Sequence, residues 1–237
     1  PRIFILSEDL TMRVEHQISL SPFTTFGVEA RAKRLVRLES REDLEALRTV
    51  REKDEPLLII GAGSNILFTK DFDGLVALNR ITGVEELPRG DAGEYRFRAG
   101  SGENWSPLVS RMTESGHPGL ENLVLIPGSV GGAAVQNIGA YGMEVGESIV
   151  SVEAVDIVKG EKVTIDVVTC RFSYRDSIFK HEWKNRFVVT YVTFRLSKRP
   201  VFRLHYGSVH DEVIRLGDIS LKTIRQAIIR IREAKLP

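Results

Sequence analysis

The chain has 237 residues, of which 42% are hydrophobic, enough for one large domain or two ordinary ones with a real core. Its 33 basic and 32 acidic residues nearly cancel, so no overall charge favours nucleic acid or an anionic membrane. The single cysteine, Cys170, cannot form an internal disulfide, which favours a reducing compartment. No apolar run reaches membrane-spanning length, and the opening "PRIFILSEDL" lacks the parts of a secretion signal. These features predict a soluble, cytoplasmic protein with no membrane insertion and no nucleic-acid partner.

The two ends of the chain are unusual. The chain begins with Pro1, whereas Met12 directly precedes "RVEHQISLSPFTTFG". We therefore expect Met12 to be the natural start and residues 1–11 to be upstream readthrough or added sequence. The closing "REAKLP" follows an apolar-periodic helix directly, which fits either a domain end or a truncation.

The first predicted elements lie between residues 41 and 100. A helix is predicted over 41–53, because Ser40 can cap it and apolar residues recur on one face. The segment "EPLLIIGAG" (55–63) then indicates a buried strand that runs into a glycine turn. Further strands are predicted in "GLVALN" (74–79) and "YRFRAG" (95–100).

The second half continues with a helix over 105–115, which Gly116 ends. Strands are predicted in "SIVSVEAVDIV" (148–158), "EKVTIDVV" (161–168) and "RFVVTYVTFRL" (186–196), and a final helix over 222–233. The fold class is therefore α+β, strand-rich in its middle.

The segment "GAGSNILF" (61–68) follows a strand, as a nucleotide-binding loop would. The dinucleotide fingerprint G-x-G-x-x-G fails here, because Ile66 replaces the third glycine and "ILF" is predicted to continue as a strand instead of a helix. Two interpretations remain. The loop binds an anion through its main-chain N–H groups, with Ser64 and Asn65 as extra donors, or it is a hairpin-type turn.

The segment "IPGSVGGAAVQNIGAYG" (126–142) is the richest in small residues, with five glycines and three alanines in seventeen positions. Such a backbone allows another group to approach closely. Gln136, Asn137 and Tyr141 add uncharged polar groups, which suit a polarised ring system better than a metal. The structural alternative is a tight crossover packed against a sheet.

A metal site is not predicted. The five histidines, His16, His117, His181, His205 and His210, show no metal-ligand spacing, and the acidic residues are scattered.

Several segments occur in the order seen in the UDP-N-acetylenolpyruvoylglucosamine reductase family. They are "TTFG" (24–27), "GAGSNILF", "GENW" (102–105), "PGLENLVLIPGSVGGAAVQNIGAYG" (118–142), "FSYRDSIFK" (172–180) and "KLP" (235–237). The chain resembles this family, in its subclass with a substrate-loop tyrosine, from about residue 18 onward. Thr24 stands where the family has an asparagine.

The resemblance implies an FAD-binding domain of the vanillyl-alcohol-oxidase (PCMH) type, built from two α+β subdomains. These would span residues 18–82 and 83–200. Residues 1–17 would be an N-terminal extension, and residues 201–237 the start of a substrate-binding domain that is truncated.

The resemblance also implies an enzyme of bacterial peptidoglycan synthesis, and hence of cell wall biogenesis, cell shape and cell division. It would reduce UDP-N-acetylglucosamine enolpyruvate to UDP-N-acetylmuramate through FAD, with NADPH as hydride donor. We expect FAD to be noncovalent, because Cys170 lies outside both glycine segments and neither contains a histidine. The expected FAD-binding residues are Gly61, Gly63, Ser64, Asn65, Ile126, Pro127, Gly128, Ser129, Gly131, Gly132, Gln136, Asn137, Gly139, Ala140 and Tyr141.

By the same resemblance, Arg175 is the catalytic residue. Its guanidinium would stabilise the negative charge that develops at the enolpyruvyl carboxylate after hydride addition. From the residues alone, a surface pair with Asp176 or a clamp on a nearby carbonyl is the favoured explanation of this arginine.

Substrate contacts are implied for Tyr174, for Tyr206 in "LHYGSV" and for Lys235, the last of these with a phosphate of the substrate or of NADPH. A tyrosine before glycine is also an ordinary turn residue, and a lysine near a helix C-terminus also complements the helix dipole.

Two other functions stay open: another flavin oxidase of the same fold that uses oxygen, and a noncatalytic FAD-binding module. In the family, a serine and a glutamate of the third domain complete the catalytic site. We therefore expect the isolated chain to bind FAD but to reduce the substrate negligibly.

Overall fold

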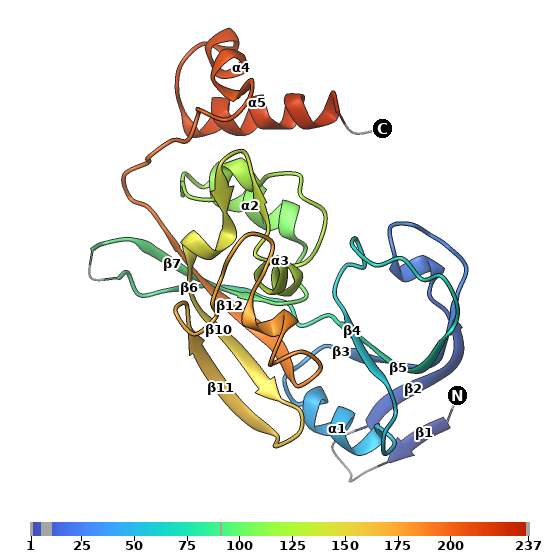
Figure 1. The fold of residues 1–237 in the computed structure, drawn as a ribbon. Coiled ribbons are helices and arrows are strands. Elements are labelled where there is room, and N and C mark those ends of the chain that lie inside the picture. Colours follow the sequence, from blue (N-terminus) through green and yellow to red (C-terminus); the bar gives the residue numbers. More distant parts are fainter. Residues whose placement is uncertain (1, 6–10, 91, 236–237) are drawn as a thin grey trace.

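The computed structural model describes residues 2–5, 11–90 and 92–235. Two five-stranded sheets lie side by side, and a pair of helices follows them at one end (Figure 1). The expectation for residues 1–11 falls mostly outside the described residues, as do Leu236 and Pro237 of the "KLP" segment.

The first sheet has the strand order β1-β2-β3-β5-β4. β1 with β2, and β2 with β3, are antiparallel, whereas β5 is parallel to both β3 and β4, so the sheet is mixed. Residues 11–17, expected in an extension ahead of the first subdomain, belong to a strand that pairs with β3. The strands are β1 (Arg2–Ile5), β2 (Thr11–Ser19), β3 (Arg31–Leu38), β4 (Leu57–Ile60) and β5 (Phe72–Asn79).

Helix α1 (Asp43–Val50) packs on one face of this sheet through Leu44 and Leu47, which are fully buried or nearly so. The predicted helix over 41–53 is confirmed, with shorter ends. Its predicted cap is present, because Ser40 Oγ accepts from Asp43 N at 3.3 Å and Asp43 Oδ2 accepts from Ser40 N at 2.8 Å.

The second sheet is antiparallel, with the order β11-β10-β12-β7-β6. Two helices cover one of its faces: α2 (Trp105–Glu114), which confirms the prediction over 105–115, and α3 (Val130–Gln136) (Figure 1). The largest core cluster lies between this sheet and the helices. The strands are β6 (Val84–Leu87), β7 (Tyr95–Gly100), β10 (Ile149–Asp156), β11 (Glu161–Asp166) and β12 (Phe187–Leu196).

The two sheets are joined at a buried asparagine at the end of β5. Asn79 Nδ2 donates to Val189 O of β12 at 2.9 Å, and its Oδ1 accepts from Ile81 N and from Ser101 Oγ. Both the nitrogen and the oxygen of its amide are thus bonded, which fixes the end of β5 against the first residues of β12.

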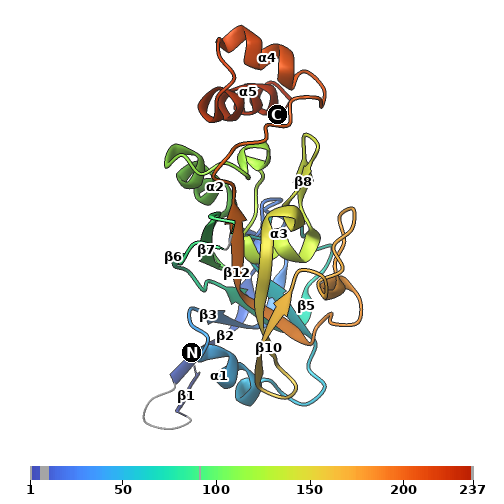
Figure 2. The ribbon, with the colours of Figure 1, turned by 90° about the vertical axis from the view of Figure 1, so that its left-hand side faces the viewer.

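Helices α4 (Val209–Leu216) and α5 (Leu221–Glu233) lie at the opposite end of the molecule from β1 (Figure 2). α5 confirms the predicted helix over 222–233 and buries one face, including Ile224 and Ile228, beside α2. Shorter elements complete the chain: 3₁₀ turns at Ser21–Phe23, Glu121–Leu123, Val145–Ser148 and Ile178–Lys180, and the hairpin β8 (Gly139–Ala140) with β9 (Met143–Glu144).

Two local predictions are wrong. Ile66–Phe68 is irregular and not a strand. Its main chain pairs with no neighbouring strand among the described residues, and Ile66 and Phe68 pack against the core of the first sheet whereas Leu67 is exposed. The segment 126–142, for which no helix is predicted, contains α3.

Candidate functional site

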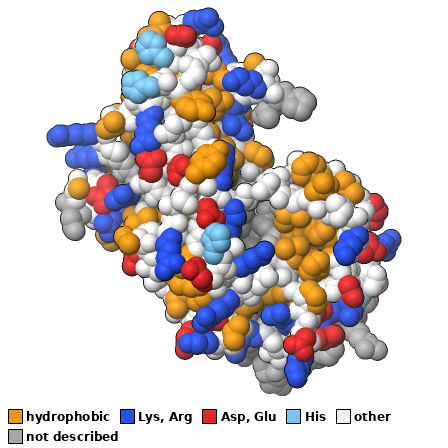
Figure 3. Space-filling view, in the orientation of Figure 1, with side chains coloured by type: hydrophobic (Ala, Val, Ile, Leu, Met, Phe, Trp, Pro, Cys, Tyr) orange, Lys and Arg blue, Asp and Glu red, His pale blue; other side chains and the backbone are white. Residues whose placement is uncertain are grey.

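A cavity of about 750 Å³ lies between the two sheets, in the range typical of ligand pockets. Figure 3 shows the hollow between the two lobes, with Lys and Arg side chains at its edge. The charged residues that line the cavity, within the described part of the chain, are all basic: Arg175, Lys180 and Lys184. The cavity therefore favours an anionic ligand.

One wall of the cavity is the turn that follows β4. Gly63 has φ +67°, and a Cβ there would meet Phe23 O at 1.9 Å, so only glycine fits. Among the described residues, the N–H groups of Ala62, Gly63, Ser64 and Asn65 donate to no protein acceptor. Consecutive free N–H groups around a residue of positive φ form an anion-binding concavity.

The facing wall is the start of the second glycine segment. Ser129 caps α3, because its Oγ accepts from Gly132 N at 3.3 Å. Val130 N and Gly131 N donate to main-chain carbonyls of Glu103 and Ser101, so the first turn of α3 has no spare donor. Beside α3, the N–H groups of Gly128 and Ser129 donate to no protein acceptor among the residues that the structure describes.

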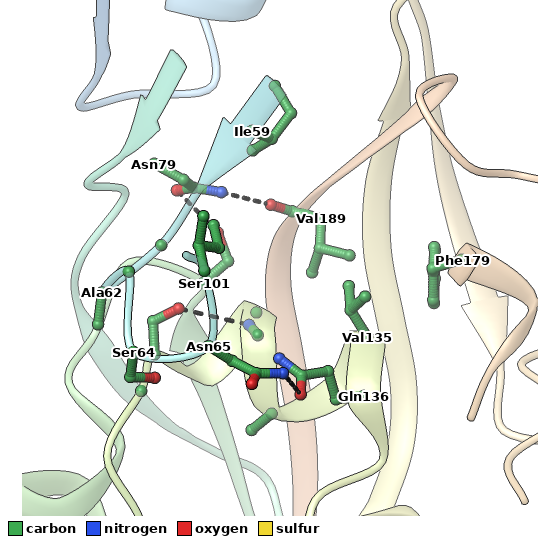
Figure 4. A pocket seen from close by; sticks show the side chains of 18 of the residues that line it. Ile59, Ala62, Ser64, Asn65, Asn79, Ser101, Val135, Gln136, Phe179 and Val189 are labelled. Carbon is green, nitrogen blue, oxygen red and sulfur yellow. Dashed lines mark hydrogen bonds between the residues drawn. The ribbon is translucent and has the colours of Figure 1, made fainter. Parts of the chain in front are cut away.

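The structure brings the two glycine segments together (Figure 4). Asn65 Nδ2 donates to Gln136 Oε1 at 2.8 Å, and Ser64 Oγ donates to Pro127 O at 3.2 Å. The close approach explains Gly61, where a Cβ would lie 2.1 Å from Ser129 Oγ. The side chains of Ser64 and Asn65, expected to be donors to a ligand, instead join the two walls.

Arg175 lies in a two-residue turn at the cavity. Ser173 and Asp176 exchange main-chain hydrogen bonds of 3.1 and 3.0 Å around it, and Arg175 has φ +55°. Its Nη2 donates to Gly139 O at 2.7 Å. Of the alternatives from the residues alone, the carbonyl clamp is therefore present, whereas Asp176 pairs with other groups.

Asp176 pairs with residues that follow it in the chain, His181 and Lys180. His181 Nε2 lies 2.7 Å from Asp176 Oδ2, and this hydrogen bond is the main cause that lowers the pKa of Asp176. Lys180 Nζ donates to Arg175 O at 2.7 Å. The turn that carries Arg175 is thus held by its main chain, its side chain and the contacts from Lys180 and His181.

Asn137 was expected to contact the cofactor, but the structure places it outside the cavity wall. It is 1% exposed, with φ +42° at the end of α3. Its Nδ2 donates to Glu144 Oε2 and to Ser173 O, and its Oδ1 accepts from Gly146 N. Asn137 therefore links α3 to the turn of Arg175, because all its polar groups have protein partners.

Three more expected FAD-binding residues, Gly139, Ala140 and Tyr141, lie in or beside the β8–β9 hairpin and are not part of the cavity wall. Gly139 instead accepts the Arg175 hydrogen bond. The other expected residues do line the cavity: Gly61, Gly63, Ser64, Asn65, Ile126, Pro127, Gly128, Ser129, Gly131, Gly132 and Gln136.

The expected substrate-binding residues lie on the surface, outside the cavity wall. Tyr206 is 60% exposed and packs edge-on against Tyr141, with ring centroids 6.2 Å apart. Tyr174 is 82% exposed beside Arg175. Lys235 is exposed just after α5. None of the three lines the cavity.

The sequence prediction missed part of the wall. Ile59, Asn79 and Val189 come from β4, β5 and β12, and Lys180 and Lys184 follow Arg175 (Figure 4). Asn79 could have been noticed as the one polar residue that ends an apolar strand. The lysines gave no signal, because exposed lysines are common.

Other site classes find little support in the described part of the chain. No helix there combines the length and apolarity needed to cross a bilayer. No group of three or more His, Cys, Asp or Glu is arranged to hold a metal ion within the same residues, and the expected lack of a metal stays a prediction.

Residues 32–166 match the family described as FAD binding domain, and the chain belongs to this family. Its α+β fold, with one mixed and one antiparallel sheet, is the predicted vanillyl-alcohol-oxidase (PCMH) type. Cholesterol oxidase from B. sterolicum shares this fold alone, with a TM-score of 0.54 at 12% identity over 78% of this chain and 38% of that one.

Within this fold the chain is a homologue of the UDP-N-acetylenolpyruvoylglucosamine reductases, as predicted. It is 45% identical to the Burkholderia mallei (strain NCTC 10229) protein over 225 residues, which are 92% of this chain and 64% of that protein. The Burkholderia cenocepacia (strain HI2424) protein is 44% identical over 223 residues, with the same coverage. The Thermus caldophilus enzyme superposes with a TM-score of 0.68 at 25% identity, covering 95% of this chain and 71% of that one. The chain spans about two thirds of the length of these curated relatives.

Proposed function

We propose that the chain binds FAD noncovalently in the cavity between its sheets. We further propose that it serves the NADPH-dependent reduction of UDP-N-acetylglucosamine enolpyruvate to UDP-N-acetylmuramate. The observation that carries the proposal is the set of N–H groups at residues 62–65, 128 and 129, which have no acceptor among the described residues. They meet across a cavity whose charged lining residues, in the same part of the chain, are all basic. The similarity to the Burkholderia reductases supports the choice of reaction.

The residues present fit an FAD group. Its pyrophosphate would be held by the two sets of main-chain N–H groups, without a dedicated arginine. The apolar side chains of Ile59, Val135 and Val189 would cover its less polar parts. This arrangement of polar N–H groups and apolar side chains matches a cofactor with a charged centre and flat rings at both ends.

The chemistry of the wall supports noncovalent binding. No cysteine or histidine lines the cavity within the described residues. Cys170 is fully buried, and burial, helped by the charge of Asp166, raises the pKa of its thiol to about 12. A neutral, buried thiol is a poor nucleophile for flavin attachment.

Bound FAD would supply the hydride, taken from NADPH. Arg175 would stabilise the charge that develops on the substrate carboxylate, because a fixed guanidinium interacts more strongly with the transition state than with the ground state. Tyr174, Tyr206 and Lys235 would bind the nucleotide sugar or a phosphate. The two sheets would correspond to the subdomains 18–82 and 83–200, with 201–237 opening the substrate-binding domain. The reaction would place the protein in the cytoplasm, in peptidoglycan synthesis.

The test begins with a visible spectrum of the purified chain, followed by heat release of the flavin and anaerobic addition of NADPH. We expect a flavin spectrum, a fully releasable chromophore and bleaching by NADPH. We expect the enolpyruvyl substrate to restore the colour only when the chain is extended by the substrate-binding domain. A colourless protein that also fails to take up added FAD refutes the cofactor assignment. Colour without bleaching identifies a noncatalytic FAD-binding module, and rapid oxygen use with a sugar or alcohol identifies an oxidase.

A further inference from the structure

Leu125 lies just before the cavity wall formed by residues 126–129 and has an unfavourable backbone. Its φ is +56°, a region that a bulky side chain rarely adopts and that costs free energy. The main-chain carbonyl of Leu125 accepts a hydrogen bond from Arg232 Nη2 of α5 at 3.1 Å, across 107 positions of sequence. The C-terminal helix therefore contacts the backbone that leads into the second glycine segment.

Arg232 differs from the other arginines of α5. Arg225 pairs with Glu114 at 3.1 Å, and Arg230 pairs with Glu212 at 3.3 Å. Within the described part of the chain, Arg232 has no carboxylate partner, although its Nε, like that of Arg225, is buried without an acceptor. Its hydrogen bond is to Leu125 O, so this guanidinium holds the segment that leads into the cavity wall.

The rest of this segment is fixed at its two ends by α2. Trp105 Nε1 donates to Leu123 O at 2.9 Å, and Trp105 N donates to Gly128 O at 3.0 Å. Leu125 lies between these points, where the backbone has its positive φ. Arg232 is therefore the polar contact to the residue with the positive φ, whereas the bond from Ser64 Oγ to Pro127 O lies nearer the cavity.

We infer that Arg232 is a positioning residue for the cofactor. It stabilises the left-handed conformation of Leu125 and so keeps Gly128 and Ser129 in the cavity wall before FAD arrives. This inference rests on the proposed FAD binding. Without the contact, only a fraction of the molecules would have the competent wall, and the apparent Kd rises by the inverse of that fraction.

The experiment measures the Kd of FAD for the cofactor-free chain by flavin fluorescence. Loss of one charge-assisted hydrogen bond commonly changes an equilibrium constant by about tenfold, so Arg232→Met should bind FAD about tenfold more weakly. Arg232→Lys, which can still reach a carbonyl, should recover part of the affinity. Arg225→Met is the matched control, because it also loosens α5 from α2 but does not touch the segment, and its Kd should match wild type.

A second variant separates positioning from general stability. Leu125→Gly tolerates the positive φ, so adding it to Arg232→Met should restore FAD affinity. In the cofactor-free chain, amide exchange of Trp105, which reports on its bond to Gly128, should be faster in Arg232→Met than in Arg225→Met. Equal Kd values and equal exchange in these two variants would overturn the inference. Failure of the wild type to bind FAD would refute the proposed function, whereas equal exchange would still refute the positioning role.

Discussion

Adjacent glycines of α3 should respond in opposite ways to alanine. A Cβ at Gly131 would lie 2.8 Å from Ser101 Cβ, closer than packed atoms allow, so the backbone must shift. Overpacking of this kind costs about 1–3 kcal/mol. A Cβ at Gly132 would meet only Ser129 Oγ at 3.4 Å, which is ordinary contact. Since alanine is favoured over glycine in a helix by up to about 1 kcal/mol, Gly132→Ala should keep or raise stability.

The cofactor makes the two substitutions informative. Both glycines line the cavity, but only at Gly132 is there room for a methyl group in the protein itself. If FAD lies against this backbone, Gly132→Ala should weaken FAD binding while the protein stays folded. Gly131→Ala should lose FAD only in proportion to its lost stability. Bulky residues at Gly131 or Gly139 would likewise disturb the fold first, because a Cβ at Gly139 would lie 2.9 Å from Met143 O.

The assay combines thermal unfolding with FAD titration. In a chain of this size, 1 kcal/mol shifts Tm by about 2–4 °C, so the fall for Gly131→Ala is measurable. Gly132→Ala should show an equal or higher Tm in the cofactor-free state and a raised Kd for FAD. Full FAD affinity in Gly132→Ala, with an unchanged fold, would show that the cofactor does not approach this backbone and that the glycines serve packing alone.

Three further predictions concern charges. In a protein extended by the substrate-binding domain, Arg175→Lys should lower enolpyruvyl turnover by about 10²–10³ but leave flavin reduction by NADPH nearly unchanged, since lysine keeps the charge and loses the planar fork; stopped-flow absorbance measures both half-reactions. Glu55→Gln should lower the unfolding free energy in urea by about 3 kcal/mol, because it leaves Arg34, 3.1 Å away and 5% exposed, without its buried partner. The hydrogen bond from Arg98 holds the pKa of Glu153 below its ordinary value of 4.5. The stabilisation that the ionised Glu153 gives to the fold is therefore present above pH 4.5 and is lost as the pH falls below it.

Each of these has its own control. Arg171→Lys changes an exposed arginine paired with Glu182 and should leave both half-reactions intact; equal loss of both in Arg175→Lys would mean that Arg175 supports only the fold. Glu52→Gln removes an exposed partner of Arg34 and should cost less than about 1 kcal/mol. Glu153→Gln should flatten the acid side of the stability curve, and an unchanged slope would show that Glu153 does not set it.

The elements that could be predicted are those whose periodicity is local. Helices α1, α2 and α5 and most strands of the second sheet follow from apolar spacing and caps. Helix α3 was missed because glycines at 131 and 132 argue against a helix, while the evidence for it is a serine cap and tertiary packing. Their glycines and amide side chains indicated that both glycine segments could contact a ligand. Nothing local could show that they face each other across a cavity.

Asn137 shows where assignment from residue type fails. An amide in a glycine-rich segment is a reasonable ligand for a ring system. Its three hydrogen-bond partners, at Glu144, Gly146 and Ser173, become neighbours only once the hairpin and the Arg175 turn have folded around it. Lys180 was missed because its role depends on a contact with the main-chain carbonyl of Arg175, which nothing in the local sequence reveals.

The structural and catalytic interpretations of Arg175 are compatible. A guanidinium has five N–H donors in a fixed plane, and the contact with Gly139 O uses one of them. The same contact orients the plane, and the bond from Lys180 to Arg175 O fixes the positive-φ turn beneath it. A side chain that must stabilise charge only in a transition state gains from being held in place beforehand, because no reorganisation is then needed when the charge develops. The carbonyl clamp, which from the sequence competes with a catalytic role, is therefore what a catalytic arginine at this turn requires.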